Sequence, residues 1–110
     1  MILTHFHGDH ILGAETFAGA RVIAHENTRS YLEEFGETEV KRFASRPELA
    51  EQLANVRLRL PDVTFASRLG FHSGDRLVEL SWLGPAHTSG DAVIALPRAI
   101  VSLPSDGIFF

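Results

Sequence analysis

The sequence of 110 residues contains no cysteine. Disulfide bridges, a thiolate nucleophile and a cysteine-ligated metal site are therefore excluded. No apolar run approaches the roughly 20 residues that a membrane-spanning helix needs. The opening MILTHFHGDH also lacks the basic leader of a signal peptide, so we expect no membrane partner. Basic residues are few as well: 10 Lys and Arg against 14 Asp and Glu give a net charge of −4, which disfavours nucleic acid as a partner.

Two catalytic motifs are also missing from the sequence, namely the GxSxG nucleophile elbow and the GxxxxGKS/T phosphate-binding loop. The composition, with 45% hydrophobic and 22% charged residues, is typical of a globular protein. Only three residues precede Thr4, where a strand is expected, and the sequence ends on apolar Phe109–Phe110. We therefore expect residues 1–110 to form a partial domain, whose cut edges are covered by an oligomeric partner or by a missing segment.

The hydrophobic pattern changes from helical to alternating spacing near Pro61. It predicts helices over 11–18, over 27–35 with Asn27 as cap and Gly36 as stop, and over 38–55. The last of these is broken at Arg46–Pro47, with Ser45 as a new cap. Strands are expected at 21–24, 63–65, 69–71, 78–82, 92–96 and 99–103, several of them in hairpins. Helices followed by strands indicate an α/β or α+β fold, with a sheet covered on one side by helices.

Histidine is the abundant residue, with six in the chain and three of them in the first ten positions. In the segment THFHGDH, His5 and His7 are two positions apart, so in extended backbone both leave from the same face. Two such imidazoles can bind one divalent ion. Gly8 lets the backbone turn, so that Asp9 and His10 can face a second ion. Imidazole combined with carboxylate suits zinc, and also manganese or iron.

Two later loops contain further candidate ligands. His87 lies in GPAHTSGD between two expected strands and would add a third histidine, and Asp106 follows the last expected strand, where a carboxylate can bridge two metals. Sites are often assembled from separate loops at strand ends. Four polar residues close to these ligands are candidates to hold the ligating rings in place, although turn chemistry explains them equally well: Thr4, Thr88, Ser89 and Asp91.

The order THFHGDH, GPAHTSGD and an apolar strand ending in an aspartate resembles the metallo-β-lactamase superfamily of metallohydrolases. The resemblance covers nearly the whole chain. It implies an αββα sandwich, in which two mixed sheets carry helices on their outer faces. This chain would supply the middle portion of that sandwich and would be incomplete at both ends.

The resemblance also assigns ligands. It implies that the first metal is bound by His5, His7 and His87, the second by Asp9 and His10, and that Asp106 bridges the two. The family's last second-metal ligand, a C-terminal histidine, has no counterpart here, and Pro104-Ser105-Asp106 stands where members often carry Thr-Gly-Asp. A carboxylate at this position, without any cysteine, is more similar to the glyoxalase II-type hydrolases than to the cysteine-ligated β-lactamases.

The expected reaction follows from the charge of the metals. Two Zn²⁺ ions about 3.5–4 Å apart can share a water and lower its pKa to about 7, which gives a hydroxide nucleophile at neutral pH. One ion would also polarise the substrate oxygen. Asp9 would orient the hydroxide and is the expected catalytic residue. We therefore expect zinc-dependent hydrolysis of an ester, thioester or amide-type bond in a small molecule, weak or absent in the isolated chain; no basic groove supports phosphodiester cleavage.

Two alternatives remain open from the sequence. Persulfide dioxygenases resemble the first motif but use a single iron, held by two histidines and an aspartate. A module that binds metal without turnover is the other alternative. The cytoplasm is the default location, although an export signal would lie upstream of this segment.

Five other residues invite a functional interpretation that we do not adopt. His25 is expected to cap or pack, His72 to lie at the surface, and Trp82 to belong to the core. Arg57 and Arg59 alternate with apolar residues and are expected to form a solvated face.

Overall fold

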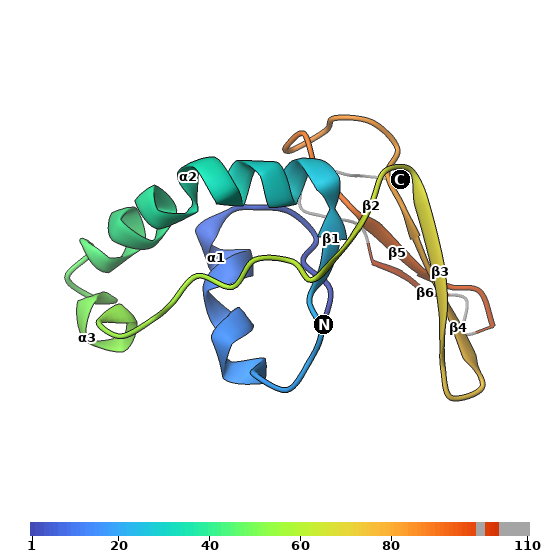
Figure 1. The fold of residues 1–110 in the computed structure, drawn as a ribbon, viewed down its shortest axis with the longest axis horizontal. Coiled ribbons are helices and arrows are strands. Elements are labelled where there is room, and N and C mark those ends of the chain that lie inside the picture. The colour runs from blue at the N-terminus through green and yellow to red at the C-terminus, as the bar shows by residue number, and fades with distance from the viewer. Residues whose placement is uncertain (99–100, 104–110) are drawn as a thin grey trace.

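The computed structural model describes residues 1–98 and 101–103 and is a mixed α/β arrangement, in which helices lie beside two sheets (Figure 1). The helical elements are α1 (Gly8–Ile11), the 3-10 helix η1 (Leu12–Phe17), α2 (Glu26–Ala44) and α3 (Ala50–Leu53). The strands are β1 (Ile23–His25), β2 (Val63–Phe65), β3 (Arg68–Ser73), β4 (Arg76–Ser81), β5 (Val93–Leu96) and β6 (Val101–Leu103). The expected fold class is confirmed.

The strands form one small parallel sheet and one antiparallel sheet. β1 pairs in parallel with β2, with Ile23 opposite Val63, and Ile2 adds a parallel bridge to Ile23. β3, β4, β5 and β6 are neighbours in chain order, and every pair is antiparallel. The β3–β4 hairpin turns at Gly74, whose φ of 63° lies in the left-handed region that favours glycine. The expected hairpins are therefore confirmed.

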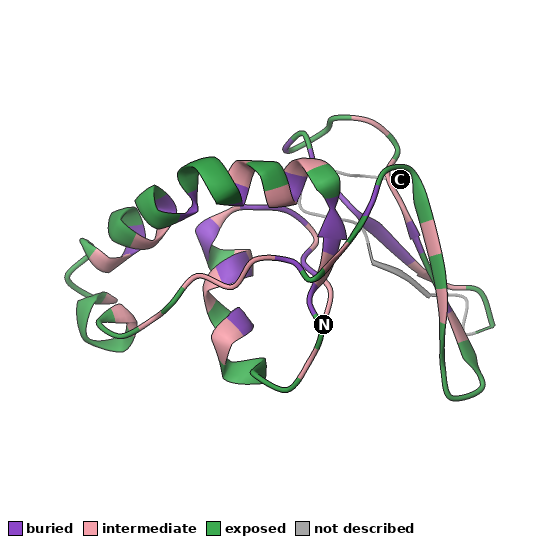
Figure 2. Ribbon diagram, in the orientation of Figure 1, coloured by how far each residue is buried: buried purple, intermediate pink, exposed green. Residues whose placement is uncertain are grey.

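Helix α2 is continuous over 19 residues, so the expected stop at Gly36 is wrong. Gly36 is buried in the middle of the helix, and a Cβ at this position would overlap the Leu58 side chain. The glycine therefore permits close packing and does not end the helix. The buried positions of α2 recur every three or four residues on the side that faces α1 (Figure 2): Thr28, Leu32, Gly36, Glu39 and Phe43.

The beginning of α2 is capped by His25, not by Asn27 as expected. His25 Nδ1 accepts the backbone N–H of Asn27 at 3.1 Å, so its hydrogen is placed on Nε2, which donates to the carbonyl of Ala66 at 2.8 Å. The buried ring also stacks on Trp82, with centroids 4.8 Å apart. The interpretation of His25 as a capping and packing residue is confirmed. Trp82 is half-buried against the core of the antiparallel sheet.

The end of α2 confirms the expected break but not the expected cap. Ser45 closes α2, because its N–H donates to the Lys41 carbonyl at 3.0 Å, and α3 begins only at Ala50. The Ser45 hydroxyl donates back to the Arg42 carbonyl at 2.8 Å, and Leu49 stands at the beginning of α3. His72 is exposed on β3, as expected.

Arg59 corrects another expectation, because it does not lie on a solvated face. Its guanidinium donates to the carbonyls of Phe17 at 2.8 Å and Ala20 at 2.9 Å, and it lies 3.5 Å from the Asp62 carboxylate. Phe17 ends η1 and Ala20 lies three residues beyond it, so Arg59 ties down the backbone that leaves this helix. Arg57 is exposed, as expected.

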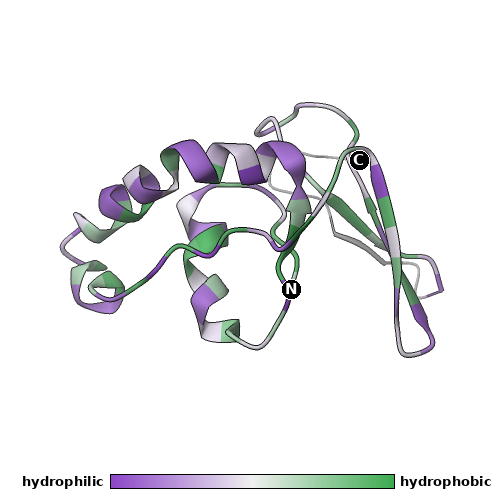
Figure 3. Cartoon of the chain, in the orientation of Figure 1, coloured by the Kyte–Doolittle hydropathy of each residue, from purple (hydrophilic) through white to green (hydrophobic). Residues whose placement is uncertain are grey.

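Two apolar clusters form the core, one under α2 and one in the antiparallel sheet. The first contains Leu3, Phe6, Ile11, Ala14, Val22, Ala24 and Leu32. The second contains Phe65, Val78, Leu80, Ala92 and Ile94. Figure 3 shows the hydropathy of the same elements. The outer surface of α2 is mostly hydrophilic, whereas β4 and β5 carry apolar residues. Over the described part of the chain, no helix is both long enough and apolar enough to cross a membrane.

Candidate metal centre

Three histidines from two loops converge in the folded chain. One ring nitrogen from each of His5, His7 and His87 lies within 4.8 Å of the others. The ring centroids are 4.9 Å apart for His5 and His7, 5.0 Å for His5 and His87, and 4.6 Å for His7 and His87. His5 is fully buried, His7 is half-buried and His87 is exposed, so the cluster runs from the core to the surface.

The backbone joins the two loops directly. The Ala92 N–H, just after the His87 loop, donates to the Thr4 carbonyl at 2.8 Å, next to His5. The Thr4 hydroxyl lies 3.2 Å from His5 Nδ1, the kind of contact that fixes the orientation of a ligating imidazole. This contact is consistent with the expected role of Thr4 in holding the His5 ring in place.

The first loop is held from the side of α2. The Phe6 ring, between the two histidines in sequence, stacks on Tyr31, with centroids 3.8 Å apart and planes at 14°. Gly8 lies against the Phe43 ring, with no room for a Cβ. The apolar residues thus face α2, and the alternating histidines point elsewhere.

The beginning of α2 holds the second loop (Figure 1). The Ser89 carbonyl accepts hydrogen bonds from the Asn27 side chain at 2.8 Å and from the Trp82 indole at 3.1 Å. The Thr28 hydroxyl donates to the Gly90 carbonyl at 3.0 Å. The sequence analysis did not identify these anchors, and no local signal would have found the two contacts from α2, because each joins residues 62 positions apart along the chain.

The second group of expected ligands is only partly assembled in the described residues. Asp9 and His10 lie on α1, where Asp9 Oδ2 is 3.5 Å from His10 Nε2. The His10 ring centroid is 4.1 Å from that of His5, but neither residue joins the three-histidine cluster. Asp106 lies outside the described residues. The second site therefore stays a prediction.

Tyr31, which supports Phe6, also provides a pH prediction. Burial, together with its hydrogen bond to the Glu39 carboxylate at 3.1 Å, raises the pKa of Tyr31 above its usual value of about 10. The folded state therefore retains the phenolic proton more tightly than the unfolded state, and this stabilisation is full below pH 10 and is lost as the pH rises further.

We therefore expect the free energy of unfolding to fall above pH 10 and to fall less in Tyr31→Phe. Tyr31 is the single tyrosine of the chain, so ultraviolet titration of phenolate reports this group alone. A Tyr31 phenol that titrates below 10 in the folded protein would contradict the prediction.

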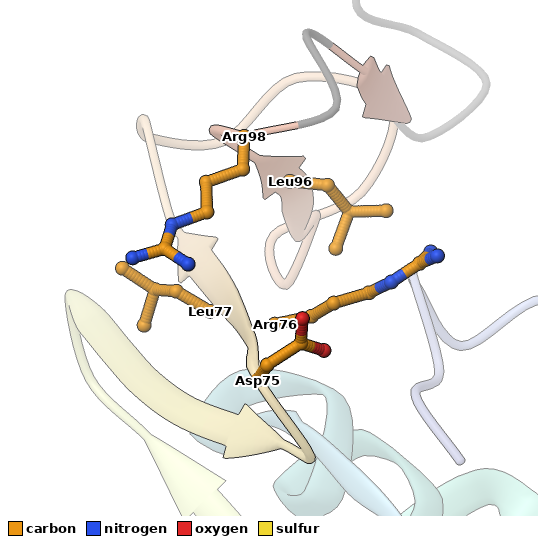
Figure 4. A pocket seen from close by; sticks show the side chains of 5 residues that line it. All are labelled: Asp75, Arg76, Leu77, Leu96 and Arg98. Atoms are coloured by element: carbon orange, nitrogen blue, oxygen red, sulfur yellow. The ribbon is translucent and has the colours of Figure 1, made fainter.

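A surface pocket elsewhere has different chemistry (Figure 4). It is lined by Asp75, Arg76, Leu77, Leu96 and Arg98 and lies at the turn end of the β3–β4 hairpin, whereas His87 follows the other end of β4. It contains none of the clustered histidines and is therefore separate from the metal centre.

Comparison with known proteins agrees with this geometry. The family model of the metallo-β-lactamase superfamily matches residues 1–106. The chain belongs to the metallo-β-lactamase superfamily. A solved structure, the metallo-β-lactamase from Pontibacter korlensis, is 26% identical and superposes with a TM-score of 0.63 over 88% of this chain. This chain covers 36% of the length of that structure. No curated protein gives a significant match.

Membership of the superfamily supports the interpretation of the three-histidine cluster as a metal site. The fold is of the metallohydrolase type, and members of the superfamily typically bind metal ions. The donor set fits such an ion: nitrogens bound to tetrahedral Zn²⁺ at about 2.0–2.1 Å lie about 3.4 Å from one another. The three ring nitrogens, within 4.8 Å, therefore need only small rotations to bind the same ion.

Proposed function

We propose that this chain carries the metal-binding part of a zinc-dependent hydrolase that cleaves an ester, thioester or amide-type bond in a small molecule. The observation that carries the proposal is the convergence of His5, His7 and His87 from two loops. Three imidazoles that leave one coordination position for water or substrate are typical of catalytic zinc sites. The cytoplasm is the location we propose, and neither nucleic acid nor a membrane is part of the proposed activity.

We propose separate roles for the histidines and for Asp9 in this reaction. When bound, zinc supplies Lewis acidity, which activates water and polarises the scissile bond. His5, His7 and His87 hold the ion, and Asp9 is proposed to accept a hydrogen bond from the attacking water and orient it. The Asp9 side chain is 64% exposed, so substrate and water can reach it. A second ion would be held by Asp9 and His10, with Asp106 as the bridge.

The three described histidines suit zinc. The mononuclear iron of a persulfide dioxygenase is held by two histidines and a carboxylate, and the carboxylate proposed for this site, Asp106, lies outside the described residues, so metal content separates the two alternatives. The first site has three described ligands, whereas the second has only Asp9 and His10, so we expect the first ion to bind more tightly than the second. After dialysis against metal-free buffer, we expect elemental analysis to find about one zinc per chain.

Activity provides the test of the proposed reaction. The chain is loaded with Zn²⁺ and assayed on a panel of activated esters, thioesters and lactams, then stripped with a chelator and reloaded. We expect hydrolysis, weak in this chain, that disappears with the chelator and returns with zinc. Turnover that survives chelation would contradict the proposal. Iron content with oxygen uptake on a persulfide would establish the dioxygenase, and tight zinc binding without turnover would show that this chain by itself binds metal without catalysis.

A further inference from the structure

The loop that carries His87 closes around one buried carboxylate. Asp91 is fully buried, and its Oδ2 accepts the backbone N–H groups of Ala86 at 3.2 Å and Thr88 at 2.7 Å. Its Oδ1 accepts the Thr88 hydroxyl at 3.1 Å, and that hydroxyl in turn accepts the Gly90 N–H at 3.2 Å. A buried carboxylate with several hydrogen bonds is strongly held in place, because its charge strengthens each bond.

These contacts are centred on His87, although none of them touches its ring. Ala86 and Thr88 are its two chain neighbours, and both donate to the same carboxylate oxygen. A further bond runs from the Ala86 N–H to the Thr88 carbonyl at 3.0 Å. The backbone of the exposed His87 is thereby fixed on both sides, which limits the directions in which its side chain can leave the loop.

A fixed backbone matters most at an exposed ligand. His5 is held by the surrounding core, whereas His87 has no comparable burial. A mobile third imidazole would lose conformational entropy when it binds an ion, and a loop that already presents it lowers that loss.

We propose that Asp91 is a positioning residue, which fixes the His87 loop so that the imidazole faces the metal before the metal binds. This inference rests on the proposed metal site. It assigns to Asp91 a hydrogen-bonding role that acts through His87, not a ligand role and not a direct role in the reaction.

The test compares Asp91→Ala with Asp91→Asn in the full chain, by titration with Co²⁺ and its visible absorption bands. The amide oxygen of asparagine can still accept both flanking N–H groups, whereas alanine accepts neither. We expect Asp91→Ala to weaken Co²⁺ binding by about 10–100-fold, the range typical of residues that support a ligand, and Asp91→Asn to stay within a few-fold of the parent. If Asp91→Asn loses as much as Asp91→Ala, the hydrogen-bonding role is wrong.

A milder pair covers the case in which Asp91→Ala does not fold. Thr88→Val removes the hydroxyl that links Asp91 to the Gly90 N–H but keeps the Thr88 backbone bond. We expect a several-fold loss of Co²⁺ affinity in Thr88→Val and its recovery in Thr88→Ser. An unchanged affinity in Thr88→Val would count against the proposal.

A double-mutant cycle separates positioning from general stability. In a His87→Ala background, Asp91→Ala should weaken Co²⁺ binding no further, because the residue through which it acts is gone. An equal loss in both backgrounds would overturn the positioning role and leave the proposed function intact. Hydrogen exchange of the Ala86 and Thr88 amides, without metal, should accelerate in Asp91→Ala. A parent chain that binds neither Co²⁺ nor Zn²⁺ would overturn the proposed function and this role together.

Discussion

Replacing His87 with alanine is expected to weaken Zn²⁺ binding by more than about 100-fold, beyond the loss typical of residues that only support a ligand. His87 is the most informative of the three histidines because it is exposed. An exposed side chain without core contacts changes the free energy of unfolding by at most about 0.5 kcal/mol when truncated. A loss of affinity in this variant therefore reports the metal site and not the fold, whereas His5→Ala would also disturb the core.

The chain offers a matched control for this measurement. His72 is also an exposed histidine, but it lies on β3 outside the cluster. Isothermal titration with Zn²⁺ should give the parent affinity for His72→Ala. If His72→Ala and His87→Ala lose the same amount, binding is a general property of surface histidines and the proposed centre is wrong.

The second large effect is expected at Gly90, where alanine should lower the free energy of unfolding by about 2–3 kcal/mol. A Cβ on Gly90 would lie 2.7 Å from the backbone nitrogen of Thr28 and closer still to its hydroxyl. The backbone at the beginning of α2 cannot move aside as a flexible side chain can. Since the same substitution pushes the His87 loop away from α2, Zn²⁺ affinity should fall with stability.

Gly19→Ala is the control for this experiment. No atom lies within 4 Å of a Cβ built on Gly19, and its backbone is not left-handed. Thermal unfolding should place Gly90→Ala about 10 °C below the parent and leave Gly19→Ala near it. If Gly90→Ala has the same melting temperature as the parent, α2 does not pack closely against Gly90 and the prediction is wrong.

Residues whose role depends on their immediate neighbours were predictable from sequence. The pairing of His5 with His7, the hairpin of β3 and β4 and the break after Ala44 follow from local spacing and turn chemistry. His87 was named from its position in a loop between two expected strands, and the structure places its ring beside those of His5 and His7.

Residues whose role depends on a distant segment were not predictable. Gly36 has the sequence signature of a helix end, but its small size serves Leu58, which arrives from beyond α3. Gly90 lies in a loop, yet its φ is not left-handed and its small size makes room for Thr28. Arg59 has the pattern of an exposed charge, but carbonyls at and just after the end of η1 accept its hydrogen bonds. Hydrophobic spacing contains no information about such encounters.

In a chain without cysteine, an ion held by His5 and His87 would act as a covalent-like cross-link between remote positions. Cross-linking a long stretch of chain removes loop-closure entropy from the unfolded ensemble. Ambient zinc would then set the melting temperature, since a free concentration 100 times the dissociation constant adds about 2.7 kcal/mol. Metal starvation would therefore expose this protein to proteolysis.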